Sequence, residues 1–254
     1  MMIQMKKISR DIKIKIKARP IIEMLGVTML VTLIIVAIDI MCKLLPPYEI
    51  LKNSWVIADL VHIPQFLVPF LLICYITKGK VKEYGFNLKE YPPVFTHKRM
   101  LIMGIFFGLL ISLRYIPQIL GNMPLDIPRP VTLVNIVGNM TFQWIVVGVC
   151  EETMFRGLIQ TYLMNNLKGY VRIFGHALHI GTVFGAIFWG GFHFINILIL
   201  PLKTVIFIVI LTTIIGLPMG YAYQKTGSSL TTIIVHNMIF GIPLTIGYIL
   251  YWLL

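Results

Sequence analysis

The chain has 254 residues, of which 57% are hydrophobic and 13% are charged, where about 25% charged residues is usual for a soluble domain. This composition argues against a soluble enzyme, a disordered chain and a free nucleic-acid-binding domain. It predicts an all-α, polytopic bundle of about seven or eight transmembrane helices. The net charge of +12 then indicates contact with anionic lipid, and no nucleic-acid partner is expected.

The first 20 residues form a basic segment, which we expect to lie in the cytoplasm against anionic lipids of the inner leaflet. Its seven basic residues are Lys6, Lys7, Arg10, Lys13, Lys15, Lys17 and Arg19. The apolar stretch at 21–42 is too long for the core of a signal peptide and lacks a small-residue cleavage site, so we expect a retained membrane span. Residues 21–254 are predicted to form a single membrane domain.

Further apolar stretches follow along the chain, and each is long enough to enter or cross a bilayer. They lie at 60–77, 100–120, 131–164, 181–200, 204–223 and 229–254. Two of them carry pairs of glycines four residues apart, which predict close packing between helix backbones. These pairs are Gly181 with Gly185 and Gly216 with Gly220.

The distribution of basic residues between the spans predicts the orientation of the protein. The loop at 78–99 holds six Lys or Arg residues, so the positive-inside rule places this loop and the N-terminus in the cytoplasm of a cell-membrane protein. Alternation of the spans places 165–180 and 224–228 on the same side. Seven spans would leave the C-terminus on the other side.

Two adjacent carboxylates, Glu151 and Glu152, end an apolar run, where each costs on the order of 3 kcal/mol at the centre of a membrane helix. Glu152 and Arg156 are four residues apart, so they share a helix face and can pair. Glu151 lies about 100° around the helix from Glu152 and is left to act elsewhere, as a general base. The alternative is an interfacial helix end at which all three charges reach water.

Two histidines lie inside later apolar runs, His193 near mid-span and His236 about 10 Å along the last span. A lone histidine in an apolar run is more often a hydrogen-bonded core residue than a functional one. Together with the glutamate pair, however, three separate spans carry an ionisable group at membrane depth, which indicates function. The other histidines, His62, His97, His176 and His179, are assigned no role.

These residues carry a family resemblance. The sequence Glu151-Glu152-x-x-x-Arg156 resembles the EExxxR motif of the CPBP membrane proteases, the Abi or CAAX-protease group that includes the Rce1-type prenyl-protein endopeptidases. The order of His193 and His236 also matches. Two further segments are similar, Lys225-Thr-Gly-Ser-Ser-Leu-Thr-Thr-Ile-Ile-Val-His236 and the loop Tyr84-Gly-Phe-Asn-Leu88, so that the resemblance covers about residues 80–245.

The chain departs from the family pattern at three positions. Trp189 stands where the second motif has phenylalanine, and Ile197 and Phe240 stand where asparagines follow the two histidines. Asn196 and Asn237 lie three residues and one residue after their histidines, and we keep them as candidate supporting residues.

The resemblance implies a glutamate-dependent intramembrane endopeptidase that needs no metal. Glu151 would take a proton from the attacking water, His193 would hold that water, and His236 would stabilise the charge on the scissile carbonyl. Glu152 would be held by Arg156. The substrate would be a peptide or protein tail at the cytoplasmic membrane face, which in Rce1-type members is prenylated.

Three alternatives stay open at this stage. Glu151, His193 and His236 could bind Zn²⁺ with one open position, although they come from three helices and lack an HExxH pair. A non-proteolytic member could keep the scaffold as a bacteriocin-immunity or regulatory protein. A small transporter could use buried Glu and His side chains as a proton relay, but it would predict an internal repeat, and the sequence shows none.

Overall fold

The computed structural model describes residues 16–44, 53–87, 94–121, 123–127 and 130–254. Within these ranges, seven helices are long and apolar enough to cross a membrane, so the protein is a multi-pass α-helical membrane protein, as predicted. They span Ala18–Leu44, Val56–Thr77, Lys98–Leu120, Leu133–Asn166, Ile180–Leu198, Leu202–Thr226 and Leu230–Leu253. Most of the predicted basic segment, residues 1–15, lies outside the described residues, and the first helix begins at Ala18 rather than at residue 21.

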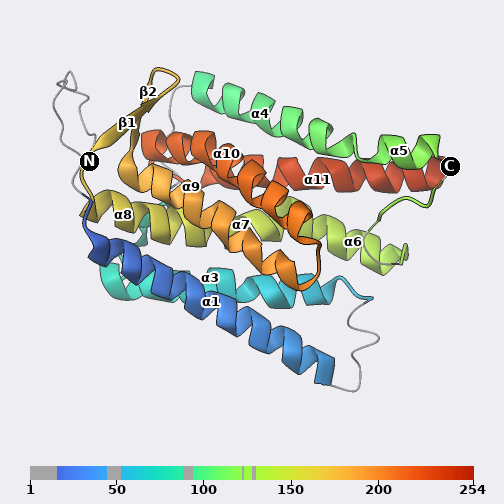
Figure 1. Cartoon of the computed structure of the whole chain (residues 1–254), viewed down its shortest axis with the longest axis horizontal. Helices are drawn as coiled ribbons and strands as arrows, with labels where there is room; N and C mark the ends of the chain where they lie inside the picture. Colours follow the sequence, from blue (N-terminus) through green and yellow to red (C-terminus); the bar gives the residue numbers. More distant parts are fainter. Residues whose placement is uncertain (1–15, 45–52, 88–93, 122, 128–129) are drawn as a thin grey trace.

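The helices follow one another in alternating directions. Their bounds are α1 Ala18–Leu44, α3 Val56–Thr77, η1 Val81–Tyr84, α4 Val94–Ser112, α5 Tyr115–Leu120, α6 Leu133–Thr141, η2 Phe142–Val146, α7 Val147–Glu152, η3 Thr153–Gln160, α8 Thr161–Asn166, α9 Ile180–Phe192, η4 His193–Leu198, α10 Leu202–Thr226 and α11 Leu230–Leu253. Because of the alternation, the start of α1 and the end of α8 lie at one end of the bundle, and the end of α11 lies at the other (Figure 1).

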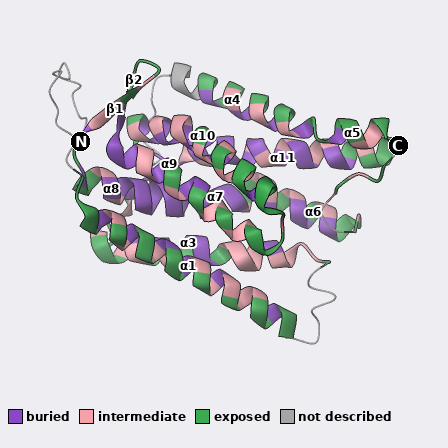
Figure 2. Ribbon diagram, viewed as in Figure 1, coloured by how far each residue is buried: buried purple, intermediate pink, exposed green. Residues whose placement is uncertain are grey.

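The span from Leu133 to Asn166 forms the centre of the bundle. Residues 150–161 are all buried, whereas the outer faces of α1 and α4 are largely exposed (Figure 2). The exposed side chains there are large and apolar, for example Leu33 of α1 and Phe106 of α4, which suits contact with lipid tails. The central span therefore places its polar residues inside protein rather than in lipid.

Two stretches of this central span are wound as π-helix, η2 and η3, on either side of the short helix α7. Such π segments are rare, and they often occur at functional sites. Here they flank Glu151 and Glu152, the last two residues of α7. The irregular winding therefore coincides with the predicted site.

Glycines permit close contact at the predicted places. A Cβ atom on Gly181 would lie 2.5 Å from the backbone nitrogen of Met164 in α8, and one on Gly216 would lie 2.9 Å from the ring of Trp189. Neither position has room for a larger side chain. The prediction that the glycine pairs serve close helix packing is thus confirmed at both pairs, and α9 is held against α8 and α10.

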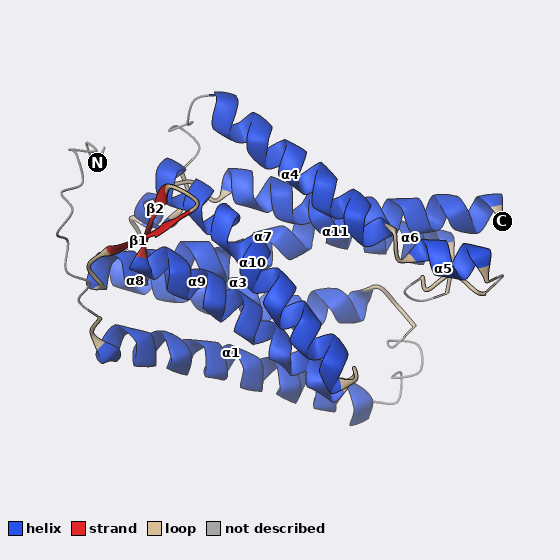
Figure 3. Ribbon diagram, turned by 45° about the horizontal axis from the view of Figure 1, so that its top comes forward, coloured by secondary structure: helices blue, strands red, loops and turns tan. Residues whose placement is uncertain are grey.

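A small antiparallel hairpin adds to the all-α architecture between α8 and α9 (Figure 3). Its strands are β1 Tyr170–Ile173 and β2 His176–His179. The two turn residues, Phe174 and Gly175, have φ angles of 48° and 78°, the backbone form that a two-residue hairpin turn favours. The sequence analysis treated this stretch only as part of the loop at 165–180.

The loop that resembles a family motif fixes the start of α11. The carbonyl of Gly85 accepts a hydrogen bond from the amide of Ser229 at 3.0 Å. Gly85 has a φ of 91°, and a Cβ atom there would lie 2.3 Å from the Ser229 hydroxyl. Only glycine fits this contact without strain, and the contact anchors the helix that carries His236. Leu88, the last residue of the motif, lies outside the described residues.

Candidate active site

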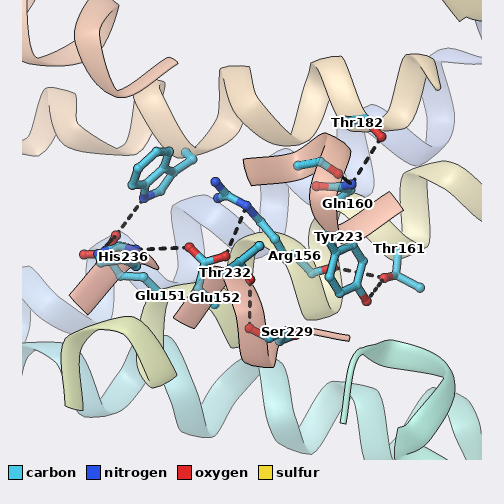
Figure 4. A network of polar contacts seen from close by, with 12 residues as sticks. Glu151, Glu152, Arg156, Gln160, Thr161, Thr182, Tyr223, Ser229, Thr232 and His236 are labelled. Carbon is cyan, nitrogen blue, oxygen red and sulfur yellow. Dashed lines mark hydrogen bonds and ion pairs between the residues drawn. The ribbon is translucent and has the colours of Figure 1, made fainter. Parts of the chain in front are cut away.

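Glu152 is fully buried between two basic side chains. Its Oε2 atom lies 3.2 Å from Nε of Arg156, and its Oε1 atom lies 3.0 Å from Nδ1 of His236 (Figure 4). The pairing that the four-residue spacing predicts is therefore present. Since Arg156 is also fully buried, the ion pair is shielded from water and holds α7 and η3 in a fixed relation.

Glu151 faces a different set of groups, as its position around the helix predicts. Its Oε2 atom accepts a hydrogen bond from Nε1 of Trp189 at 2.7 Å and lies 3.8 Å from Nε2 of His236. Its Oε1 atom lies 3.7 Å from Nε2 of His62. This carboxylate is 6% exposed, so it meets imidazole and indole nitrogens rather than bulk water.

His236 lies between the two carboxylates and joins them. An ionised carboxylate only accepts hydrogen bonds, so Nδ1 of His236 donates to Glu152. Its other nitrogen, Nε2, is directed at Glu151 and has no hydrogen-bond partner within the described part of the chain. A buried nitrogen in this state is suited to hold a water or a substrate group.

Trp189 is the other side chain that organises the site. It is fully buried, its indole nitrogen binds Glu151, and its ring lies 4.6 Å from the guanidinium carbon of Arg156. Its ring also contacts those of His193 and His236. The sequence analysis noted this residue only as a departure from the family phenylalanine, yet phenylalanine has no donor for Glu151.

His193 begins η4, directly after α9. Its Nδ1 atom lies 2.8 Å from the carbonyl of Trp189, and because a carbonyl only accepts, Nδ1 carries the proton. The ring packs edge-on against Trp189, whose indole nitrogen donates to Glu151. The structure thus places His193 beside the site, with its Nε2 atom left as an acceptor.

The two candidate asparagines have other contacts. The Oδ1 atom of Asn237 accepts a hydrogen bond from the amide of Gly148 at 2.8 Å, which ties α11 to α7. The main-chain carbonyl of Asn196 accepts hydrogen bonds from the amides that follow it and closes the turn after η4. Glu152 and Arg156 therefore belong to the site around Glu151, whereas the two asparagines hold a helix contact and a turn.

A second group of buried polar residues continues along the same helix. Gln160, also fully buried, donates to the carbonyl of Gly220 at 2.8 Å and to Thr182 at 3.2 Å. The Thr161 and Tyr223 hydroxyls are 2.6 Å apart (Figure 4). These bonds join the central span to α9 and α10, the elements that carry or support Trp189 and His193.

The zinc site named as an alternative in the sequence stays a prediction. Within the residues that the structure describes, no group of three or more His, Cys, Asp or Glu side chains is arranged to hold a metal ion. Glu151, His193 and His236, the set named for Zn²⁺, do not form one.

Sequence reasoning missed His62, which lies on α3 and whose Nε2 atom faces Oε1 of Glu151. It stands in an apolar stretch, and the charged residue at helical spacing from it, Asp59, belongs to the same helix and predicts no link to the glutamate pair. The His62 ring packs edge-on against Phe142 of η2, with centroids 4.8 Å apart. Only the packing of α3 against α7 reveals this contact, and no pattern in the sequence indicates it.

The fold and the site define a class of protein: a multi-pass membrane protein with a buried cluster of glutamate, histidine and arginine. Residues 133–241 match a protein family described as type II CAAX prenyl endopeptidase Rce1-like. This region carries both glutamates, Arg156, His193 and His236, and the match supports the predicted resemblance to the CPBP (Rce1-like) family. Searches of curated proteins and of solved structures give no match.

Proposed function

We propose that this protein is an intramembrane endopeptidase that cleaves a peptide bond in a membrane-associated peptide or protein tail. The observation that carries the proposal is the position of Glu151, a buried carboxylate with an indole and two imidazole nitrogens directed at it. A scaffold would not need a second buried carboxylate beside the Glu152–Arg156 pair. The family match supports this class of reaction.

The groups present are sufficient for a water-based mechanism. Glu151 accepts a proton from water while the water oxygen bonds to the scissile carbonyl carbon. His236, when Nε2 carries a proton, donates it in a hydrogen bond to the oxyanion, and Glu152 balances the charge on the ring. The carbon–nitrogen bond then breaks, and the proton held by Glu151 passes to the leaving amine. His193 packs on Trp189, the donor to Glu151, and so helps to orient the water through this carboxylate.

The depth of the site suits a substrate that comes from the cytoplasm. His236 lies about 9 Å along α11 from Leu230, at the end of the bundle that the basic residues predict to be cytoplasmic. We therefore propose a cell-membrane protein with its N-terminus in the cytoplasm, where anionic lipids bind the basic segment. A tail that enters from that side reaches Glu151 without crossing the membrane.

An apolar groove beside the site suits a lipid-modified tail. It lies between α1 and α9–η4 and has a volume of about 640 Å³. Its walls are almost entirely hydrocarbon, and they include Leu25 and Leu33 of α1 and Phe192 and Ile195 next to His193. A lipid chain in this groove would hold the attached peptide near the catalytic groups.

The proposal is tested with purified protein in liposomes and internally quenched peptides. The panel contains a farnesylated peptide with a CAAX end, the same peptide with a free cysteine, and an unrelated membrane-anchored peptide. We expect cleavage of at least one of them, unchanged by a chelator. Loss on chelation that is restored by Zn²⁺ would contradict the water-only mechanism.

One observation favours a different function. Phe240 stands where the family has an asparagine, and the amide of Asn237 is committed to helix contacts, so an asparagine is missing as an oxyanion donor. A non-proteolytic protein that acts in bacteriocin immunity or regulation would keep the bundle and lack turnover. Failure to cleave any peptide of the panel, by protein that is folded in liposomes, would support this second function.

A larger side chain in the groove is expected to weaken the binding of lipid-modified substrates and to leave the binding of unmodified substrates unchanged. Gly191 lines the groove, and a Cβ atom there would meet nothing within 4 Å, so Gly191→Leu should fold normally. We expect KM for the farnesylated peptide to rise about 10-fold or more, because the added side chain takes the space of several methylenes. KM for the unmodified peptide should stay the same.

Gly26→Leu is the matched control, since Gly26 of α1 also has open space around it and lies outside the groove lining. Equal effects of the two substitutions, or equal effects of Gly191→Leu on both peptides, would show that the groove does not bind the lipid.

A further inference from the structure

His62 approaches Glu151 from α3, outside the region that matches the family. Its Nε2 atom is 3.7 Å from Oε1 of Glu151, the carboxylate oxygen that neither Trp189 nor His236 approaches. The side chain is 21% exposed, and Phe142 holds its ring on one side. The two oxygens of Glu151 thus have different neighbours.

The hydrogen bond at the other ring nitrogen fixes the tautomer of His62. Its Nδ1 atom lies 2.7 Å from the carbonyl of Ala58, one helical turn earlier. A carbonyl only accepts, so the proton is on Nδ1 and the neutral ring presents a bare Nε2 to Glu151. Two acceptors, a carboxylate oxygen and an imidazole nitrogen, therefore face one another at 3.7 Å.

A buried carboxylate oxygen and a partly buried imidazole nitrogen that face one another at this distance need a group that donates to both. Water carries two O–H donors, and a molecule that directs one to each acceptor keeps its lone pairs free on the opposite side. That is the orientation a nucleophilic water needs, with its oxygen toward the substrate and its protons toward bases.

We propose that His62 is a catalytic residue that binds the attacking water together with Glu151. In the reaction, the water oxygen bonds to the carbonyl carbon and one proton passes to Oε1 of Glu151, while the other O–H stays hydrogen-bonded to Nε2 of His62. His62 neither gains nor loses a proton over the cycle. This role rests on the endopeptidase function proposed above, and it assigns to α3 a part of the site that the family region lacks.

Two substitutions at position 62 test the roles of the two ring nitrogens separately. In His62→Asn, the amide lies near the place of Nδ1, so the bond to Ala58 is retained and the acceptor at Nε2 is lost. In His62→Gln, the longer side chain places an amide oxygen near Nε2. We expect His62→Asn to lower kcat on the order of 10- to 100-fold with KM within about twofold, and His62→Gln to recover much of that loss.

The measurement uses the liposome assay with whichever peptide of the panel the parent protein cleaves fastest, and unfolding temperatures in detergent report folding. His176→Asn, at the exposed first residue of β2, is the matched control and should leave kcat unchanged. Unchanged kcat in His62→Asn, or equal losses in the Asn and Gln variants with the fold intact, would overturn the role of His62. If His62→Asn does not fold, a kcat for His62→Gln as low as that of Glu151→Gln would also overturn it.

Glu151→Gln in the same series distinguishes the two proposals. If Glu151→Gln is inactive and His62→Asn is as active as the parent protein, the endopeptidase function stands and only His62 is wrongly assigned. If the parent protein cleaves nothing, both proposals fail together. If Glu151→Gln is fully active, the endopeptidase activity stands, but the mechanism through Glu151 and the role of His62 both fail.

Discussion

Glutamine in place of Glu151 is expected to lower kcat by a factor of about 10² to 10⁴, the range that a positioned general base contributes. Glutamine has the same shape, and its amide oxygen can still accept the hydrogen bond from Trp189. It cannot, however, take a proton from water. The loss should therefore appear in kcat for every substrate of the liposome panel, while the unfolding temperature changes little.

Glu83→Gln is the matched control for this substitution. Glu83 lies on η1 and is exposed, so the same loss of one negative charge there should leave kcat unchanged. Cleavage by the Glu151 variant at the parental rate would remove Glu151 from the mechanism, and another group would then have to activate the water.

The sequence was sufficient wherever one helix alone determines the geometry. Glu152 meets Arg156 and Glu151 points away because residues four apart share a face and neighbours do not. The spans were predictable for a similar reason, since bilayer thickness dictates the length of an apolar helix. His236 and His193 became candidates because each is ionisable at membrane depth and because of a family resemblance.

The rest of the site depends on which helices are neighbours, and no local pattern in the chain encodes this. His62 and Glu151 are far apart in sequence and meet because α3 packs against α7 and η3. Trp189 departs from the family residue, and only the fold shows that its nitrogen binds Glu151. The breaks inside two spans, after α4 and at His193, were missed as well, because apolar composition continues across them.

The buried ion pair has a consequence for stability that differs from its consequence for catalysis. Arg156→Met, which keeps most of the length of the side chain, is expected to lower the free energy of unfolding by about 3–5 kcal/mol. It leaves Glu152 in a fully buried position where, of the residues that the structure describes, only His236 is a partner. The cost comes from that uncompensated charge, and it should be visible in a denaturant titration in mixed micelles.

Two comparisons decide whether charge is the cause. The double variant Glu152→Gln, Arg156→Met removes both charges, so it should recover on the order of 1–3 kcal/mol of the lost stability. Its activity should stay low, since a neutral side chain at position 152 no longer balances a charged His236. Arg19→Met removes an exposed arginine with the same four-residue spacing from Glu23 and should cost at most about 0.5 kcal/mol. If the double variant is no more stable than Arg156→Met, the ion pair does not explain why this arginine is buried, and its packing on Trp189 becomes the main interaction that holds it.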